Sequence, residues 1–241
     1  MGYCGRVPTD RLSAVLAAMA ELDGDHPSVL DRLCGAAVAL LSLRGAGISL
    51  MVDGELRGTA GVSGSGVAVV QELQFELGEG PCVDAWASME PVLEPDLASP
   101  DVVRWSVFAP DAVAAGVLAV FAFPLHLGAI RIGILVLYRD RPGGLDADEL
   151  AYGLVLADLA TWMILGLQSG EPGDGLHEFL AVEPSHWAEV HQATGIVAVQ
   201  LGVGLDEALV RLRGHAFAEG RPLREIAREV VAHRLRLEPL R

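Results

Sequence analysis

The chain has 241 residues, enough for one large or two small domains, and 51% of them are hydrophobic, so a substantial core is expected. Its 32 acidic residues outnumber its 17 basic ones, all arginine, and the net charge of −15 argues against a general nucleic-acid binder. Three widely spaced cysteines, Cys4, Cys34 and Cys82, form no metal spacing and no disulfide framework, which favours a reducing cytoplasm.

The first two thirds of the chain alternate between helical and strand patterns. Apolar spacing of three and four predicts helices over residues 10–22, 28–43, 67–76, 82–88 and 105–115. Apolar runs and alternation predict strands over residues 47–52, 57–62, 91–94, 118–124 and 129–138. Asp53-Gly54 is a strong hairpin signal between the first two strands. This order predicts an α+β domain, an antiparallel sheet with helices packed on one side.

A long apolar helix follows, with an acidic first turn that suits the helix dipole, and it is predicted over residues 146–168. Residues 150–167 have about the length of a membrane span. Asp158 lies at its middle, however, and a central charge costs about 2.5–3.5 kcal/mol on insertion scales. We therefore expect this helix to be buried between subunits or domains, with no membrane partner.

Several short motifs in this region resemble those of a GAF domain. They are Leu77-Gly78-Glu79-Gly80-Pro81-Cys82, Pro91-Val92, Phe121-Ala122-Phe123-Pro124-Leu125 and Gly133-Ile134-Leu135-Val136-Leu137-Tyr138. The resemblance implies a sensor or dimerisation domain over residues 1–168, paired in a homodimer through the helix 146–168. It also implies a pocket for an unidentified small molecule under the sheet. Trp86, Trp105 and Phe108 are candidates to line that pocket, or else they are ordinary core aromatics.

Residues 169–185, rich in glycine, proline and acid, are predicted to be a linker. The charge changes across it. Residues 1–185 hold 25 acidic and 9 basic side chains, whereas residues 186–241 hold 7 acidic side chains and 8 arginines. A nucleic-acid site in the last segment must therefore be confined to one face of it.

The last segment, residues 186–241, is predicted to form three short helices that pack together, since none is long enough to be stable alone. The first carries apolar residues between Val190 and Leu201. Gly204 stands at the N-cap position of the second helix and Gly220 where that helix should stop. Pro222 suits the first turn of the third helix, because the missing N–H has no partner there anyway.

These helices carry short motifs that resemble an ANTAR domain, the three-helix RNA-binding domain of bacterial transcription antiterminators. The matching residues are Ala193-Thr194-Gly195, Asp206-Glu207-Ala208, Leu212-Arg213, Ala216, Leu223, Ile226-Ala227 and Val230-Val231. The chain departs from the family at Thr194, where many members carry lysine, so the phosphate contact that the resemblance implies for that lysine is not carried over to this position.

The candidate RNA contacts are polar, basic or small residues of the three helices. They are His191, Gln192, Thr194, Gly195, Arg213, Arg221, Arg224 and Arg228. Arginine forks onto phosphates and stacks on splayed loop bases. The last three arginines stand at steps of three and four, which favours one helix face. The alternative is that Arg224 and Arg228 merely pair with Glu225, Glu229 or Asp206 on a solvated face.

The motifs of common enzymes are missing from the sequence. It holds no Gly-rich phosphate loop, no HExxH and no CxxC, and His126 has no second ligand spaced for a metal or haem. We therefore expect no enzyme activity, no metal and no cofactor. The sequence predicts a cytoplasmic antitermination regulator that binds paired hairpin loops in nascent RNA. The alternative is a ligand-sensing interaction module whose C-terminal helices bind protein or DNA.

Overall fold

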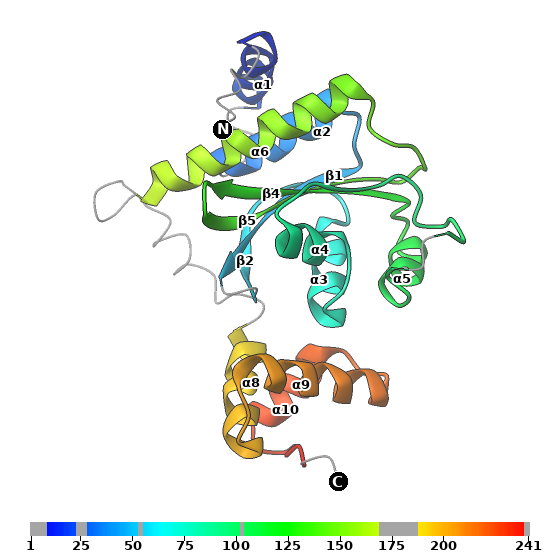
Figure 1. Cartoon of the computed structure of the whole chain (residues 1–241), viewed down its shortest axis with the longest axis vertical. Helices are drawn as coiled ribbons and strands as arrows, with labels where there is room; N and C mark the ends of the chain where they lie inside the picture. Colours follow the sequence, from blue (N-terminus) through cyan, green and yellow to red (C-terminus); the bar gives the residue numbers. More distant parts are fainter. Residues whose placement is uncertain (1–8, 23–27, 53–54, 102–103, 169–187, 239–241) are drawn as a thin grey trace.

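The computed structural model describes residues 9–22, 28–52, 55–101, 104–168 and 188–238. They form a sheet domain, up to residue 168, and a three-helix domain, residues 188–238 (Figure 1). The predicted linker, residues 169–185, lies outside the described residues, as do Cys4 and the Asp53-Gly54 turn.

The described strands form one antiparallel sheet of five, in the order β2-β1-β5-β4-β3. Their bounds are β1 (Gly45–Val52), β2 (Glu55–Gly64), β3 (Val92–Glu94), β4 (Ala119–Leu127) and β5 (Ile130–Arg139). At the centre, Ile48 of β1 lies opposite Leu135 of β5, and both are fully buried. Each predicted strand is present, with ends shifted by a few residues.

Helices cover both faces of the sheet (Figure 1). One face carries α2 (Val29–Leu40) and α6 (Ala147–Gln168), with α1 (Thr9–Glu21) packed on them. The other carries α3 (Val67–Leu77), α4 (Pro81–Ser88) and α5 (Phe108–Ala114). The prediction of helices on one side is wrong, because successive residues of the central strands, such as Ile134 and Leu135, are both buried. Successive strand residues point to opposite faces, so both faces are apolar and need cover.

Helix α6 has the length and composition of a membrane span, with a mean hydropathy of 1.8 over Ala147–Leu167. In this structure it is a core helix of the sheet domain, since Leu156, Ala160 and Ile164 are fully buried against β4 and α2. Its opposite side leaves Leu154 46% and Trp162 62% exposed. One side of the helix therefore lacks apolar cover.

The Gly-Glu-Gly-Pro turn between α3 and α4 anchors a distant helix. An oxygen of the Glu79 carboxylate accepts hydrogen bonds from the N–H groups of Val107 and Phe108, each at 2.8 Å. These are donors that the first turn of α5 leaves unpaired. Helix α5 begins at Phe108, three residues later than predicted. Trp105, the predicted start of the helix, lies before it, and its indole N–H donates to Asp84 at 3.1 Å.

Candidate nucleic-acid interface

The three-helix domain has a compact apolar core. It consists of α8 (Ala188–Leu201), α9 (Leu205–Glu219) and α10 (Leu223–Val231). The side chains at its centre are Val190, Ala193, Val197, Ala208, Leu209, Leu212, Ala216, Leu223, Ile226, Ala227 and Val230, all at most 5% exposed. Gly204 is the N-cap of α9, and Gly220 ends that helix with a left-handed φ of 62°, as the sequence predicts.

Two of the predicted RNA contacts on α8 lie at an open groove. The groove is lined by Gln192, Gly195, Ile196, Val199, Gln200, His233, Leu235 and Arg236. Gln192 is exposed, and a Cβ added to Gly195 would meet nothing within 4 Å, so the backbone of α8 is approachable there.

Thr194 does not belong to the surface. Its side chain is only 2% exposed, and its hydroxyl donates a hydrogen bond to the carbonyl of Val190 at 2.8 Å. A threonine in a helix commonly satisfies its hydroxyl in this way on the carbonyl four residues before. The prediction that Thr194 presents a donor to RNA is therefore wrong for this arrangement of the domain.

Arg221 and Arg228 are each held by carboxylates of their own domain. Arg221 donates to both oxygens of Glu229, at 2.9 and 3.2 Å, and also pairs with Glu219 and Glu225. The hydrogen bonds to Glu229 raise the pKa of Arg221, and Arg221 in turn lowers the pKa of Glu229. Arg228 lies 2.8 Å from Glu189 of α8, with 54% of its side chain exposed. Its side chain is more exposed than those of the other three predicted arginines, Arg213, Arg221 and Arg224.

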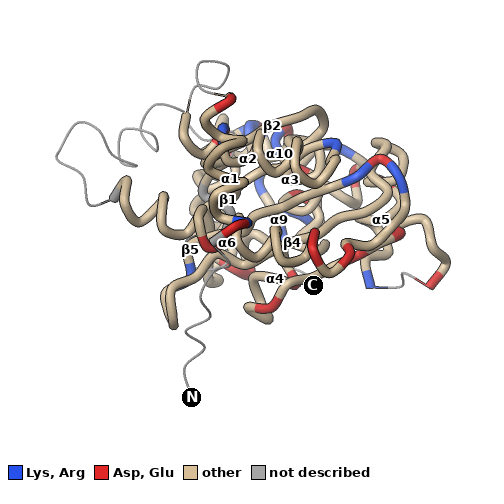
Figure 2. The backbone as a smooth tube through the Cα atoms, turned by 90° about the horizontal axis from the view of Figure 1, so that it is seen from above, with Lys and Arg blue, Asp and Glu red and all other residues tan. Residues whose placement is uncertain are grey.

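The remaining predicted contacts turn toward the sheet domain. His191 lies edge-on to the ring of Phe75 in α3, with centroids 6.1 Å apart. The Nε of Arg213 donates to the carbonyl of Phe75 at 2.9 Å, and Arg224 lies 3.4 Å from Glu72, also in α3. Figure 2 marks the basic and acidic positions along the backbone. Each helix of the three-helix domain therefore contributes one predicted RNA contact to this junction.

The predicted pocket aromatics do not line the cavity under the sheet. Trp105 and Phe108 are at most 1% exposed and pack edge-to-face, 6.2 Å apart, in the core beneath α5. Trp86 is half-buried, with Arg131 near its ring. The alternative that Trp105 and Phe108 are core aromatics is thus the correct one. In an apolar protein, large aromatics are the side chains most strongly driven to fill the interior.

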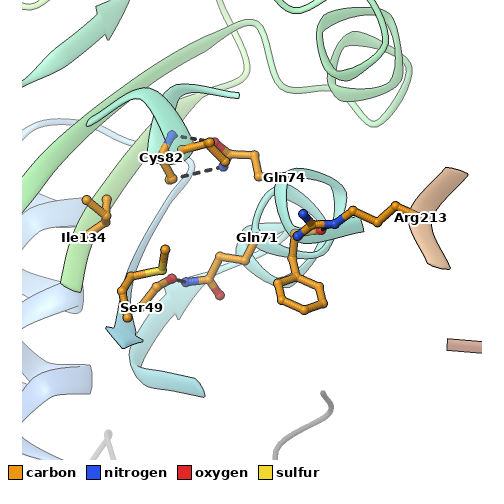
Figure 3. Close-up of a pocket in the computed structure, with 9 residues that line it drawn as sticks. Ser49, Gln71, Gln74, Cys82, Ile134 and Arg213 are labelled. Atoms are coloured by element: carbon orange, nitrogen blue, oxygen red, sulfur yellow. Dashed lines mark hydrogen bonds between the residues drawn. The ribbon is translucent and has the colours of Figure 1, made fainter. Parts of the chain in front are cut away.

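The cavity lies between α3, α4 and the sheet (Figure 3). Its lining residues are Ser49, Met51, Gln71, Gln74, Phe75, Cys82, Val83, Ile134 and Arg213. The space that the centre of a water molecule can occupy is about 50 Å³, room for a few waters or a small ligand. The sequence did hold a signal for it: Gln71 and Gln74 are polar residues three apart inside an apolar helix.

Hydrogen bonds within the cavity wall satisfy most of its polar groups. The Gln71 amide donates to the Ser49 hydroxyl at 2.7 Å, and the Gln74 carbonyl accepts from the Cys82 N–H at 2.6 Å. Burial raises the pKa of the Cys82 thiol to about 12, so the thiol is neutral near pH 7. Arg213 brings a full positive charge to this wall, and it comes from the three-helix domain (Figure 3).

Comparisons with known proteins agree with this architecture. The GAF domain family model matches residues 24–164, more than half of the chain, and the ANTAR domain model matches residues 184–231. The GAF domain of a phosphoenolpyruvate-protein phosphotransferase from Acinetobacter is 13% identical, with a TM-score of 0.51, over 68% of this chain and 97% of that one. Its counterpart from Coxiella burnetii is 17% identical, with a TM-score of 0.48, over 66% and 96%. No curated protein matches the sequence.

Both resemblances found in the sequence motifs are confirmed by these matches. The GAF match covers the five-stranded sheet with α2 to α6, and helices α8 to α10 lie in the ANTAR match. The chain belongs to the GAF domain family and carries an ANTAR domain in its C-terminal helices.

Proposed function

We propose that this protein is an RNA-binding regulator of transcription antitermination that acts in the cytoplasm. The three-helix domain binds paired hairpin loops in nascent RNA and stabilises an antiterminator hairpin over a competing terminator. The sheet domain senses a signal, pairs two chains, or does both. No catalytic step is part of this proposal.

The observation that carries the proposal is the compact three-helix domain in an ANTAR match, with arginines on its surface. The sheet domain carries the acidic excess, so RNA has reason to approach only the arginine-bearing part of the molecule. Gln192 and the backbone near Gly195 add polar contacts on α8, beside the open groove. Arginine forks on phosphates and stacking on splayed bases fit this surface.

A homodimer is the second part of the proposal, and α6 is its candidate contact. The exposed side of this helix offers Leu154 and Trp162, eight positions apart and so on one face. A second copy of the same surface would cover them symmetrically. Two three-helix domains held in one dimer would suit an RNA with two hairpin loops.

A gel shift with a two-hairpin RNA across a salt series tests RNA binding. Arg228→Ala is the sharpest variant, because Arg228 pairs with Glu189 of its own domain and not with α3. We expect affinity to fall about tenfold and the salt slope to shrink by about 1, the effect of losing one phosphate contact.

The matched control is Arg141→Ala, which removes the same charge from an exposed site on the sheet domain and should leave binding unchanged. An equal loss of RNA affinity in both variants would show that only the net charge of the protein matters, and not the position of Arg228. A DNA hairpin of the same sequence belongs in the same series. Equal affinity for DNA, or no binding to either nucleic acid, would favour the alternative of a module that binds DNA or protein.

A further inference from the structure

The end of helix α3 receives a guanidinium group from the other domain. The Nε of Arg213 donates to the carbonyl of Phe75 at 2.9 Å, and its guanidinium carbon lies 5.3 Å from the centre of the Phe75 ring. The last turn of a helix leaves carbonyls without partners and carries partial negative charge. Gly78 makes room for this cap, since a Cβ there would stand 2.8 Å from a terminal nitrogen of Arg213.

The same turn of α3 also holds the start of α10. Glu72 lies 3.4 Å from Arg224, and Glu76 lines the same hollow as Leu223, the first residue of α10. Burial and the neighbouring Glu72 raise the pKa of Glu76, and the nearby backbone of Leu223 opposes that rise. Each helix therefore caps the other, with anions at the N-terminus of α10 and a cation at the C-terminus of α3.

Phe75 joins the two domains through apolar contact. Its side chain is 5% exposed and belongs to the core of the three-helix domain, where it packs edge-on against His191. Phe75 thus buries its ring across the junction, and the polar contacts of Glu72 and Glu76 surround it. The cluster formed by Glu72, Phe75 and Glu76 is called the α3 latch below.

We propose that the α3 latch is an intramolecular competitor of RNA. This inference rests on the proposed function. A guanidinium that donates to a carbonyl or a carboxylate cannot direct the same N–H groups to a phosphate. The latch occupies one predicted RNA contact from each helix, namely His191, Arg213 and Arg224. It presents two carboxylates and a helix C-terminus, the same sign of charge as an RNA backbone.

The latch is suited to opening. Its ion pair between Glu72 and Arg224 is partly solvated, with side chains 40% and 29% exposed, so it contributes little by itself. Several RNA phosphates can then replace one carboxylate and one carbonyl. Gln71 and Gln74, on the same helix, line the cavity under the sheet, so a shift of α3 there moves the latch as well.

The test uses the full chain with changes confined to the sheet domain. The variant Glu72→Gln with Glu76→Gln weakens the polar half of the latch and keeps the side-chain sizes, whereas Phe75→Ala removes the apolar half without a change in charge. If the binding-competent fraction rises from about one tenth to nearly one, affinity for the two-hairpin RNA rises about tenfold. The matched charge control is Glu21→Gln with Glu90→Gln, two exposed carboxylates elsewhere on the sheet domain.

A second measurement reports on the junction without RNA: the rate of hydrogen–deuterium exchange over α10. Faster exchange together with tighter RNA binding, in both latch variants but not in the control, is the expected result. Faster exchange with unchanged RNA affinity, while Arg228→Ala still weakens binding, would overturn the latch and leave the proposed function standing. If neither the wild-type chain nor the opened variants bind RNA, the proposed function fails and the latch fails with it. An equal rise in RNA affinity in the control variant would also overturn the latch, because the loss of two negative charges anywhere on the sheet domain would then explain the result.

Discussion

The two faces of the GAF sheet are built differently. On the face under α2 and α6, strand residues such as Ile48, Phe121 and Leu135 form one apolar core. On the face under α3, β1 contributes Gly45, Gly47 and Ser49, and the space beneath holds glutamine amides and a cavity. Glycine is needed there, because a Cβ on Gly47 would stand 2.4 Å from a methyl group of Val67 in α3.

The two faces therefore have different neighbours in the molecule. The α2 and α6 face packs as one apolar core. On the other face, helix α3 lines the cavity, donates the Gln71 hydrogen bond to Ser49, and accepts the hydrogen bond from Arg213 of the three-helix domain. Arg213 is bonded directly to α3, so a displacement of this helix would be felt at Arg213, whereas the opposite face is a close-packed apolar core.

The largest expected effect is on the α2 and α6 face. Phe123→Ala removes a fully buried ring from its core and should lower the free energy of unfolding by about 3–5 kcal/mol. Chemical denaturation of the purified chain measures it. Val69→Ala, at a 41% exposed position on α3, is the control and should change stability little. A loss below about 1 kcal/mol for Phe123→Ala would deny that this face is the main support.

On the α3 face the polar network should contribute less. Gln71→Ala leaves the hydroxyl of Ser49, which is 4% exposed, without its donor, and also removes the acceptor of the Thr59 hydroxyl. An unpaired buried polar group costs about 1–3 kcal/mol. Denaturation compared with exposed Gln192→Ala measures it. No loss of stability would mean that water takes over both bonds, and the cavity would then be wet rather than closed.

The turn at Glu79 tests how the same face positions α5. Glu79→Ala removes both hydrogen bonds to the N–H groups of Val107 and Phe108, a loss of about 1–2 kcal/mol for a helix N-terminus. Hydrogen exchange should accelerate over residues 107–114 and stay unchanged over α6. Acceleration spread evenly over the sheet domain would argue that Glu79 supports the whole fold.

The smallest effect on stability is expected at the exposed side of α6. Trp162→Ser changes a 62% exposed side chain and should alter the free energy of unfolding by less than about 0.5 kcal/mol. If α6 forms the proposed dimer contact, the same variant lowers the mass in solution from dimer to monomer, measured by light scattering. Leu93→Ser, an exposed change on β3, should leave that mass unchanged. An unchanged mass for Trp162→Ser would contradict the contact.

Some features of the fold could be predicted because they depend on neighbours along the chain. Gly204 and Gly220 cap α9 as predicted, since caps act within one helical turn, whereas Pro222 is the N-cap of α10 and not part of its first turn. The alternation in β1 predicts a strand for the same local reason. The burial of Thr194 could not be predicted from its polar side chain. The hydroxyl is satisfied by the carbonyl of Val190 in the same helix, so the residue can be buried without a partner elsewhere.

The candidate site depends on contacts that no local pattern encodes. Arg213 meets Phe75 from 138 positions away along the chain, and Arg224 meets Glu72 from 152 positions away. The arginine pattern showed that these side chains are available for an anion. It did not show that a helix of the other domain offers them one.

By itself the sequence determined the two domain families and most of the helices and strands, because motifs and periodicity are properties of short segments. Only the tertiary structure decided that helices cover both faces of the sheet and that Trp105 is a core residue. It also decided that α3 holds His191, Arg213 and Arg224. These outcomes depend on which distant segments the folded chain brings within a few ångströms, and that is set by packing of the whole molecule.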